Sequence, residues 1–290
     1  MKILVTGSNG QLGNEIRLIA KLYKEYEFIF TDKNDLDIVN SSSLDHFFNN
    51  NSIDYIINCA AYTAVDDAES YPKLANEINH IAVRQLAEIA KLRNIKLIHI
   101  STDYVFDGSL YRSYQEIDNT NPQSVYGITK LNGEKALLEI APEAIIIRTS
   151  FLYSSFGSNF VKTMLELGRT KNKVSIVCDQ IGSPTYAKNL ADIILEIISH
   201  KIITNCYTPP QIFHYSNEGK VSWFDFAKKI FQLEDILCEI QPIKSLEYKT
   251  KAVRPMYSVL NKEKIKNTFD IVVPKWEDSL IECLKKIKEN

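Results

Sequence analysis

Hydrophobic positions along the first half of the chain follow two alternating patterns. Short apolar, β-branched runs are typical of buried strands, and they occur at Lys2–Thr6, Glu27–Thr31, Asp54–Asn58, Ile95–Ser101 and Ala144–Thr149. The segments between them carry apolar residues at helical spacing, at Gly10–Lys24, Ser41–Asn50 (with Ser42 or Ser43 as its cap), Pro72–Arg93 and Gly127–Ile140. Strands that alternate with helices form right-handed crossovers and a parallel sheet covered on both faces. The pattern therefore predicts an α/β fold with a Rossmann-type doubly wound parallel sheet.

The regular alternation of strand and helix patterns ends after Arg148. A strand is expected at Val174–Val177, and helices are expected at Phe160–Arg169, Ala187–Ile198, Trp223–Phe231 and Trp276–Ile287. We expect a dinucleotide-binding domain over residues 1–150 and a smaller, mixed α/β, mainly substrate-binding region over 151–290. Segments around 174–200 are expected to return to the first domain. Both tryptophans, Trp223 and Trp276, have apolar neighbours at helical spacing, which favours core packing.

Composition excludes several classes of protein. The chain has 290 residues, with 34 basic and 36 acidic side chains, whereas nucleic-acid binders usually carry a net basic patch. No apolar run approaches the ~18 residues of a membrane span, and the N-terminus lacks a signal-peptide pattern. The five cysteines are widely scattered and the histidines are singletons, which favours reduced thiols and no metal site. We expect a cytoplasmic protein that binds neither nucleic acid nor membrane.

A glycine-rich turn follows the first strand. Gly7, Gly10 and Gly13 stand where a strand gives way to a helix. In that context the glycines allow a tight turn, close approach of backbone to a pyrophosphate, and close packing of helix on strand. Helix N–H groups then face the phosphates. The spacing differs from the G-x-G-x-x-G of the two-domain dehydrogenases, but its position predicts a dinucleotide site.

Asp32 ends the second strand, where a carboxylate can bind the adenosine ribose. A carboxylate there favours NADH, because it repels a 2′-phosphate. Lys33 stands beside it and is able to accept such a phosphate. The sequence leaves NADH and NADPH open.

Tyr126 and Lys130 stand four residues apart on a predicted helix, so that both side chains lie on one face. A cationic neighbour favours phenolate and lowers the pKa of a tyrosine. Tyr126 is then a candidate proton donor to a carbonyl oxygen, and Lys130 a candidate ligand of the cofactor ribose. Chance alone produces about one such pair in a chain this rich in Tyr and Lys, so context decides. Thr102, at the carboxyl end of the fourth strand, faces the crevice where ligands bind and completes the set.

Further segments complete a joint pattern, at 58–66, 101–108, 125–134, 148–153, 179–185 and Arg254-Pro255. Together with the glycine turn they resemble the dTDP-4-dehydrorhamnose reductase family, within the extended short-chain dehydrogenase/reductase superfamily. The resemblance implies reduction of the C4 ketone of dTDP-4-dehydro-β-L-rhamnose, a dTDP-linked 4-keto-6-deoxy sugar, to dTDP-L-rhamnose. It also implies NADH or NADPH as cofactor and polysaccharide biosynthesis as the setting.

The same resemblance implies roles for individual residues. Catalysis falls to Thr102, Tyr126 and Lys130. Besides the glycines, Asp32, Tyr126 and Lys130, the implied cofactor contacts are Gln11, Leu12, Asp37, Ile38, Ala60, Ala61, Tyr62, Thr63 and Ser101. The implied sugar contacts are Thr102, Asp103 and Phe151. Arg254 is either a ligand of the substrate diphosphate, since guanidinium binds phosphate in a bidentate manner, or a surface arginine.

Two departures from the family pattern stand out. Phe151 occupies a position where Trp is common, and Tyr62 one where His is common. Some members of the family join two subunits through Mg²⁺ held by acidic residues. Glu15 is available for this, but Lys188 stands where a further acid would help, so the sequence leaves a homodimer open without predicting a metal.

Other functions remain as alternatives. An epimerase or 4,6-dehydratase uses the same scaffold, although dehydratases tend to carry Asp-Glu after the Thr, and here Asp103 is followed by Tyr104. A non-catalytic, dinucleotide-binding regulatory subunit is the second alternative. It has no need of the Thr102, Tyr126 and Lys130 set. The preferred 4-keto sugar and the stereochemistry of the product stay open.

Overall fold

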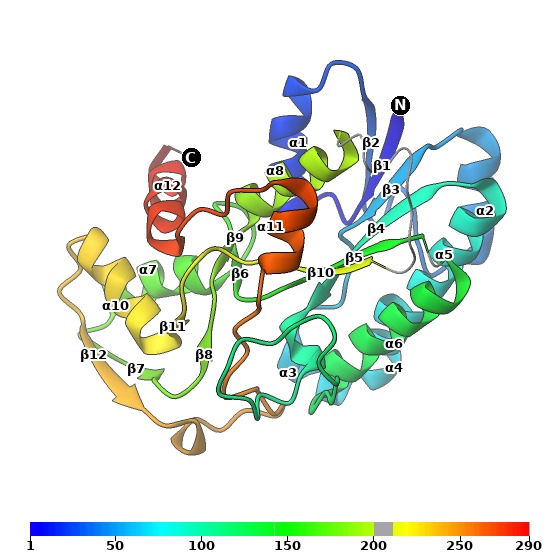
Figure 1. Ribbon diagram of the computed structural model, residues 1–290. Helices are drawn as coiled ribbons and strands as arrows, with labels where there is room; N and C mark the ends of the chain where they lie inside the picture. The colour runs from blue at the N-terminus through cyan, green and yellow to red at the C-terminus, as the bar shows by residue number, and fades with distance from the viewer. Residues whose placement is uncertain (142, 200–210, 290) are drawn as a thin grey trace.

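The computed structural model describes residues 1–141, 143–199 and 211–289, and it confirms the doubly wound α/β fold (Figure 1). Six parallel strands form one sheet in the order β10-β5-β4-β3-β1-β2. They are β1 (Lys2–Thr6), β2 (Glu27–Thr31), β3 (Tyr55–Asn58), β4 (Lys96–Thr102), β5 (Ile145–Thr149) and β10 (Gln211–His214). The winding direction reverses between β1 and β3. Ligands of open α/β sheets bind beyond the carboxyl ends of the strands at such a switch point.

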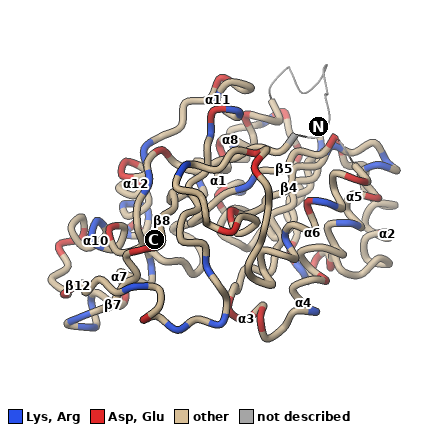
Figure 2. Tube along the Cα trace, turned by 60° about the horizontal axis from the view of Figure 1, so that its bottom comes forward, with Lys and Arg blue, Asp and Glu red and all other residues tan. Residues whose placement is uncertain are grey.

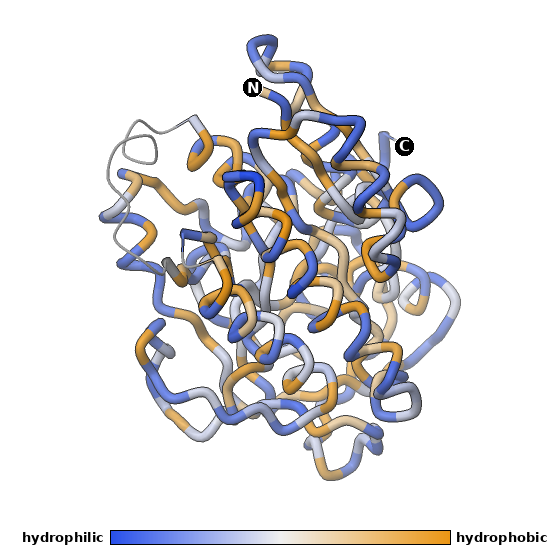
Figure 3. The backbone as a smooth tube through the Cα atoms, turned by 90° about the vertical axis from the view of Figure 1, so that its right-hand side faces the viewer, coloured by the Kyte–Doolittle hydropathy of each residue, from blue (hydrophilic) through white to orange (hydrophobic). Residues whose placement is uncertain are grey.

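Helices cover both faces of the sheet (Figure 1). One face carries α1 (Gln11–Ile19), α8 (Ala187–Ser199) and α11 (Glu263–Phe269), and the other α2 (Ser41–Asn50), α4 (Pro72–Asn76), α5 (Ala82–Arg93) and α6 (Val125–Ile140). Alternate residues of β1 enter opposite cores: Ile3 and Val5 join the α1/α8 side, and Leu4 joins the α5 side. Strands buried on both faces read as continuous apolar runs. Figure 3 shows the matching alternation of polar and apolar residues around the covering helices.

A second region packs beside the carboxyl edge of the sheet. Its larger elements are α7 (Phe160–Thr170), α10 (Trp223–Leu233), α12 (Trp276–Glu289) and the parallel pair β7 (Lys173–Val177) and β12 (Glu239–Ile243). Its short strands are β6 (Leu152–Tyr153), β8 (Ile181–Gly182), β9 (Thr185–Tyr186) and β11 (Val221–Ser222). A third apolar cluster fills it, and Trp276 is buried there as predicted. The chain returns to the sheet in between, because α8 packs on α1 and β10 pairs with β5.

Local details differ from the sequence pattern. The first helix ends at Ile19 and continues as a 3₁₀ turn, η1 (Ala20–Leu22). The expectation that Ser42 or Ser43 caps α2 is wrong, because the side chain of Asn40 accepts the hydrogen bond from the Ser43 N–H. The helix expected over Pro72–Arg93 is interrupted by a π-helical segment, η2 (Glu77–Ile81). Strand β10 was not expected at all. The remaining elements are α3 (Val65–Ser70), η3 (Asp103–Val105) and η4 (Ser245–Glu247).

Charged residues of both signs are mixed along the chain, and the described cysteines are unpaired. Figure 2 shows Lys and Arg interspersed with Asp and Glu along the chain. In the described part of the chain, no helix combines the length and the apolar character needed to cross a bilayer. Cys59, Cys178, Cys238 and Cys283 carry free thiols. Cys206 lies outside the described residues.

Helix α6 approaches its neighbours backbone to backbone. A Cβ placed on Gly133 would overlap the carbonyl oxygen of Asn79, and one on Gly127 would overlap the carbonyl oxygen of Tyr104. Glycine at these two positions lets α6 lie directly against η2 and η3. The helix is thereby fixed in depth, and so are the side chains that it presents at the carboxyl edge of the sheet.

We expect Gly133→Ala to lower the free energy of unfolding by about 1–3 kcal/mol, despite the better helix propensity of alanine. The added methyl group meets backbone, which cannot swing aside as a side chain does. Urea unfolding followed by circular dichroism measures the change. Lys135→Ala, on the exposed face of the same helix, is the control and should stay within about 0.5 kcal/mol of the parent. Equal stability of the two variants would contradict the packing argument.

Candidate functional site

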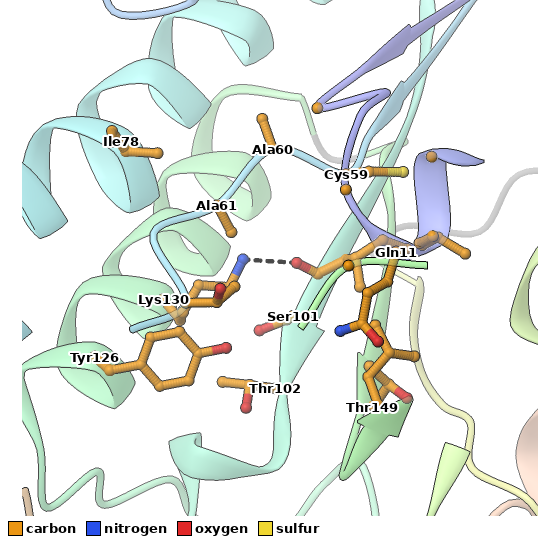
Figure 4. Close-up of a pocket in the computed structure, with 18 of the residues that line it drawn as sticks. Gln11, Cys59, Ala60, Ala61, Ile78, Ser101, Thr102, Tyr126, Lys130 and Thr149 are labelled. Carbon is orange, nitrogen blue, oxygen red and sulfur yellow. Dashed lines mark hydrogen bonds between the residues drawn. The ribbon is translucent and has the colours of Figure 1, made fainter. Parts of the chain in front are cut away.

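A cavity of about 960 Å³ opens at the switch point of the sheet. It runs along the carboxyl ends of β1, β3 and β4 and is closed on its far side by the second region. Figure 4 shows Tyr126, Lys130, Ser101 and Thr102 on one side of it and Gln11 on the other. The cavity therefore joins the glycine turn to the predicted catalytic residues.

The structure brings nearly all of the predicted site residues to this one cavity. Those that line it are Gly7, Gly10, Gln11, Leu12, Gly13, Asp32, Asp37, Ile38, Ala60, Ala61, Thr63, Ser101, Thr102, Asp103, Tyr126, Lys130 and Phe151. Two predicted residues, Tyr62 and Arg254, do not line it.

The glycine turn is sterically enforced. Gly7 has a φ of 63°, and a Cβ on it would lie 2.7 Å from the Ala60 backbone. A Cβ on Gly13 would lie 2.5 Å from the Cα of Ser8. Side chains at these positions would push the turn away from the loop after β3 and from its own helix. Glycine is thus required for the turn to close against the floor of the cavity.

The turn also fits the diphosphate of a dinucleotide. Among the described residues, no side chain caps the N-terminus of α1 at Gly10. The first N–H groups of this nine-residue helix are therefore left to an anion in the cavity, where the helix dipole also favours negative charge.

Asp32 lies at the ribose end of the same cavity, immediately after β2. Its carboxylate accepts hydrogen bonds from the Asn9 amide and, at 2.8 Å, from the Asn34 N–H. Lys33 lines the cavity beside it. Asp32 and Lys33, whose opposite charges leave the choice between NADH and NADPH undecided from the sequence, thus lie side by side in the structure.

Tyr126 and Lys130 extend from the first two turns of α6 into the cavity, as their spacing predicts. Lys130 is only 1% exposed, and its Nζ donates to the Ile100 carbonyl at 2.6 Å (dashed line in Figure 4). Burial lowers the pKa of Lys130 to about 8. Its position holds an amine beside the phenol, deep in the protein.

The pKa of Tyr126 departs from the expected direction. Burial raises it to about 12, although the hydroxyl of Thr102 acts in the opposite direction. The predicted lowering by Lys130 is wrong, because burial dominates the pKa of Tyr126 and the amine donates instead to the Ile100 carbonyl of β4. The phenol is consequently protonated at neutral pH.

The end of β4 supplies three polar side chains to the cavity. Thr102 caps η3, since its Oγ1 accepts from the Tyr104 N–H at 3.2 Å, and it also lines the cavity. Burial raises the pKa of Asp103 to about 6, against the hydrogen bonds of Ser258 and Thr102. The Ser101 hydroxyl donates to Glu134 at 2.5 Å.

A buried ion pair supports this edge from behind. Arg148 donates to both carboxylate oxygens of Glu134, at 2.9 and 2.7 Å. Both side chains are at most 3% exposed. Arg148, at the end of β5, is thus held in a structural ion pair. Breaking such a pair leaves a buried charge uncompensated, at a cost of about 3–5 kcal/mol.

An aromatic wall forms the side of the cavity next to the second region. Phe151, at a φ of 47°, stacks on Trp223 with ring centroids 3.7 Å apart, and Phe160 packs on the same indole. A Cβ on Gly182 would lie 2.7 Å from the Phe151 ring. The packing expected for Trp223 is found, since it packs on the third cluster, but this partly buried residue also lines the cavity. Its indole closes the site from a segment distant in sequence.

Asn79 is a supporting residue that the sequence analysis missed. It is fully buried in η2. Its side chain accepts from the Tyr62 N–H at 2.8 Å and donates to the Tyr62 carbonyl and the Thr129 hydroxyl, both at 3.1 Å. Tyr62 is thus held through its backbone. A buried asparagine at the third position of an irregular helical segment carries no pattern that identifies it in advance.

Arg254 pairs with Asp66 on α3 and not with any group of the cavity. The guanidinium reaches Asp66 at 2.6 and 3.2 Å, and it lowers the pKa of that carboxyl. A phosphate at Arg254 would have to compete with this pair. In the described part of the chain, no three His, Cys, Asp or Glu side chains are arranged to hold a metal ion.

Comparison with known proteins gives a consistent result. The family model described as "RmlD substrate binding domain" matches residues 1–289. A dTDP-4-dehydrorhamnose reductase of Aggregatibacter actinomycetemcomitans is 38% identical over 286 residues, covering 96% of this chain and 97% of the relative.

Two solved structures are similar over almost their whole length. The crystal structure of a dTDP-4-dehydrorhamnose reductase of Clostridium acetobutylicum superposes with a TM-score of 0.93 at 41% identity, covering 99% of this chain and all of the other. The enzyme of Bacillus anthracis, solved in complex with NADP, has a TM-score of 0.91 at 38% identity and covers 98% and 99% of the two chains.

Asp32 gives a test of the ribose end of the cavity. We expect Asp32→Asn to lower KM for NADPH relative to KM for NADH by about fivefold, because the substitution removes about 1 kcal/mol of repulsion between two solvated negative charges. Initial rates of cofactor oxidation measure the ratio. Asp45→Asn, on an exposed position of α2 outside the cavity, is the control. An unchanged ratio in Asp32→Asn would show that this carboxylate does not face the adenosine ribose.

Proposed function

Since the chain belongs to the dTDP-4-dehydrorhamnose reductase family, we propose that it reduces the C4 ketone of dTDP-4-dehydro-β-L-rhamnose to give dTDP-L-rhamnose. It is an NAD(P)H-dependent oxidoreductase of nucleotide-sugar biosynthesis. One observation carries the assignment of roles: Tyr126, Thr102 and Lys130 line the same cavity as an uncapped glycine-rich helix N-terminus.

The dinucleotide supplies a hydride to the ketone carbon when it is bound. The first turn of α1 holds its diphosphate, Asp32 and Lys33 face its adenosine ribose, and Asp37 and Ile38 line the adenine side. Ala61 and Thr63 contact it after β3. This division follows the family resemblance, and all of these residues line the cavity.

Tyr126 is the proton donor to the ketone oxygen. Reduction consumes one proton at that oxygen, so the donor has to be protonated before the step. Burial raises the pKa of Tyr126 to about 12, so the phenol stays protonated over the physiological pH range. Proton transfer leaves a phenolate, which the same burial disfavours, so the charged form of Lys130 has to stabilise it.

Thr102 orients the ketone oxygen, and Lys130 holds the cofactor ribose and adjusts the charge beside the phenol. Asp103 and the aromatic wall of Phe151 and Trp223 meet the sugar. A 6-deoxy sugar has an apolar side that packs on aromatic rings, and hydroxyl groups that require polar partners. Arg254 meets the substrate diphosphate only if its pair with Asp66 opens.

The domain assignment supports the same division of labour. Residues 1–150 form the dinucleotide-binding domain and 151–290 mainly the substrate-binding region, with α8 and β10 returning to the sheet. Cytoplasmic location is proposed from the free thiols of the described cysteines. A homodimer would not use a metal at Lys188, because this lysine pairs with Asp192 and Glu282.

The two alternative functions, an epimerase or dehydratase and a regulatory subunit, differ from a reductase in whether they consume the cofactor. An epimerase retains its cofactor through turnover, and a regulatory subunit turns nothing over. Oxidation of NADH and NADPH measured against nucleotide-linked 4-keto-6-deoxy sugars, with the product identified by NMR, separates all three. Stoichiometric cofactor oxidation with formation of dTDP-L-rhamnose supports the reductase, and absence of turnover with this sugar would overturn it.

We expect Tyr126→Phe to lower kcat by about 10²–10⁴-fold, because the general acid is lost while the ring remains. Cofactor affinity should change little, as measured by fluorescence titration with NADPH. Tyr104→Phe, the ring edge-on to Tyr126, is the matched control and should keep most of its turnover. Unchanged turnover in Tyr126→Phe would refute its role.

We expect Trp223→Leu to raise KM for the sugar nucleotide by about two- to tenfold, because an aromatic contact contributes about 0.5–1.5 kcal/mol beyond its buried area. The cofactor dissociation constant should stay within about twofold. Phe224→Leu, the adjacent partly buried aromatic outside the cavity, serves as the control. Equal KM values in the two variants would remove Trp223 from the sugar site.

A further inference from the structure

A buried chain of polar side chains lies behind the amine of Lys130. The Thr6 hydroxyl donates to Asn58 Oδ1 at 2.7 Å, Asn58 Nδ2 lies 3.0 Å from His99 Nδ1, and His99 Nε2 lies 3.2 Å from Lys130 Nζ. All four side chains are at most 1% exposed. With no solvent to compensate, each contact needs a donor and an acceptor.

The orientation of the Asn58 amide is fixed by a backbone group. The Ala60 N–H donates to the Asn58 side chain at 3.2 Å. A backbone N–H only donates, so the atom that it meets is the carbonyl oxygen, Oδ1. The other end of the amide, Nδ2, therefore faces His99, and it faces His99 as a donor.

This orientation in turn fixes the tautomer of His99. Its Nδ1 accepts from Asn58 Nδ2 and so carries no proton. Burial lowers the pKa of His99 well below its usual value, and a neutral imidazole with a bare Nδ1 carries its proton on Nε2. That N–H points at Lys130 Nζ.

An N–H aimed at a lysine opposes its charged form. An ammonium group has three donors and no acceptor, whereas a neutral amine has a lone pair. As an amine, Lys130 accepts from His99 Nε2–H and still donates to the Ile100 carbonyl at 2.6 Å. We propose that His99 is a positioning residue that favours the neutral amine of Lys130, in a tautomer imposed on it by Asn58.

The other groups around Lys130 leave room for this effect. Tyr126 and Glu134 face it from α6, Cys59 from the end of β3, and His99 with the Ile100 carbonyl from β4. Glu134 favours the ammonium, but its carboxylate is already bound by Arg148 and by Ser101. Burial and His99 act in the opposite direction. Burial, against Glu134 and Cys59, lowers the pKa of Lys130 to about 8, and the His99 N–H acts in the same direction as burial.

The consequence rests on the proposed reductase function. The ammonium form of Lys130 stabilises the negative charge that develops on Tyr126 as the ketone oxygen takes its proton. With a pKa of about 8, the lysine carries its charge at neutral pH and loses it just above. His99 thus lowers the pH at which Lys130 loses the charge that supports proton transfer.

The first test needs no substrate. Long-range ¹H–¹⁵N NMR of the histidine side chains in the full-length protein identifies the tautomer of His99, assigned by its loss in His99→Phe. We expect the Nε2–H form at neutral pH. The Nδ1–H form would overturn the proposal, because it would present a lone pair to Lys130.

The second test measures the lysine directly. We expect the Lys130 midpoint, followed by NMR of ¹³Cε-labelled lysine, to rise by about one pH unit or more in both Asn58→Asp and His99→Phe. A carboxylate at position 58 can only accept. It keeps the bonds from Thr6 and Ala60 but reverses the His99 tautomer. His99→Phe removes the N–H altogether. His80→Phe, a histidine outside the cavity that pairs with Asn76, is the control and should leave the midpoint unchanged.

Kinetics then separate this inference from the proposed function. The pH at which reductase turnover falls on the alkaline side should rise in Asn58→Asp and His99→Phe with the Lys130 midpoint, a change that mere loss of packing does not cause. An unmoved midpoint in folded Asn58→Asp and His99→Phe would overturn the proposal while leaving the reductase intact. A wild-type protein with the Nε2–H tautomer and the lowered midpoint but no turnover would refute the proposed function alone.

Discussion

The burial of Lys130 against β4 is the constraint on which the rest of the site depends. An amine with 1% exposure is tolerated only because every direction around it is satisfied: the Ile100 carbonyl, the imidazole of His99 and the cavity itself. To bring the lysine there, α6 has to lie against backbone, which Gly127 and Gly133 permit. The same depth places the phenol of Tyr126, one turn earlier, at the edge of the sheet where a dinucleotide fits.

Much of the fold and many residues of the site could be predicted because their signals are local. Buried parallel strands are continuous apolar runs, so the first five were located to within a residue or two. The glycine turn and the Tyr126–Lys130 pair lie within short segments whose geometry follows from one strand, one turn or one helix face. What the pattern could not give was the sign of the tyrosine pKa. That sign depends on how deeply the cavity buries the phenol, which is a property of the assembled structure.

Several features that were missed or corrected depend on contacts between distant segments. Trp223 follows an amphipathic pattern that is identical for a core residue and for a cavity wall, and only the position of Phe151 above Gly182 decides between them. Arg254 finds Asp66, 188 positions away, and this pair removes it from the cavity. Strand β10 has four residues and becomes a strand because β5 offers an unpaired edge. No local pattern contains such information.

A ketone reduction requires proton transfer and recognition of the sugar, and the polar and aromatic sides of the cavity each meet one of these requirements. The β4 edge handles protons: it combines a protonated phenol, a lysine whose pKa burial lowers to about 8 and a carboxyl group, Asp103, whose pKa burial raises to about 6. The aromatic wall carries no charge and offers shape alone. Proton chemistry is thus fixed by β4 and by α6, which packs on the sheet, whereas recognition of the sugar falls to Phe151 and α10 at its border. A change of sugar preference can therefore arise at the aromatic wall without disturbing the groups that deliver the proton.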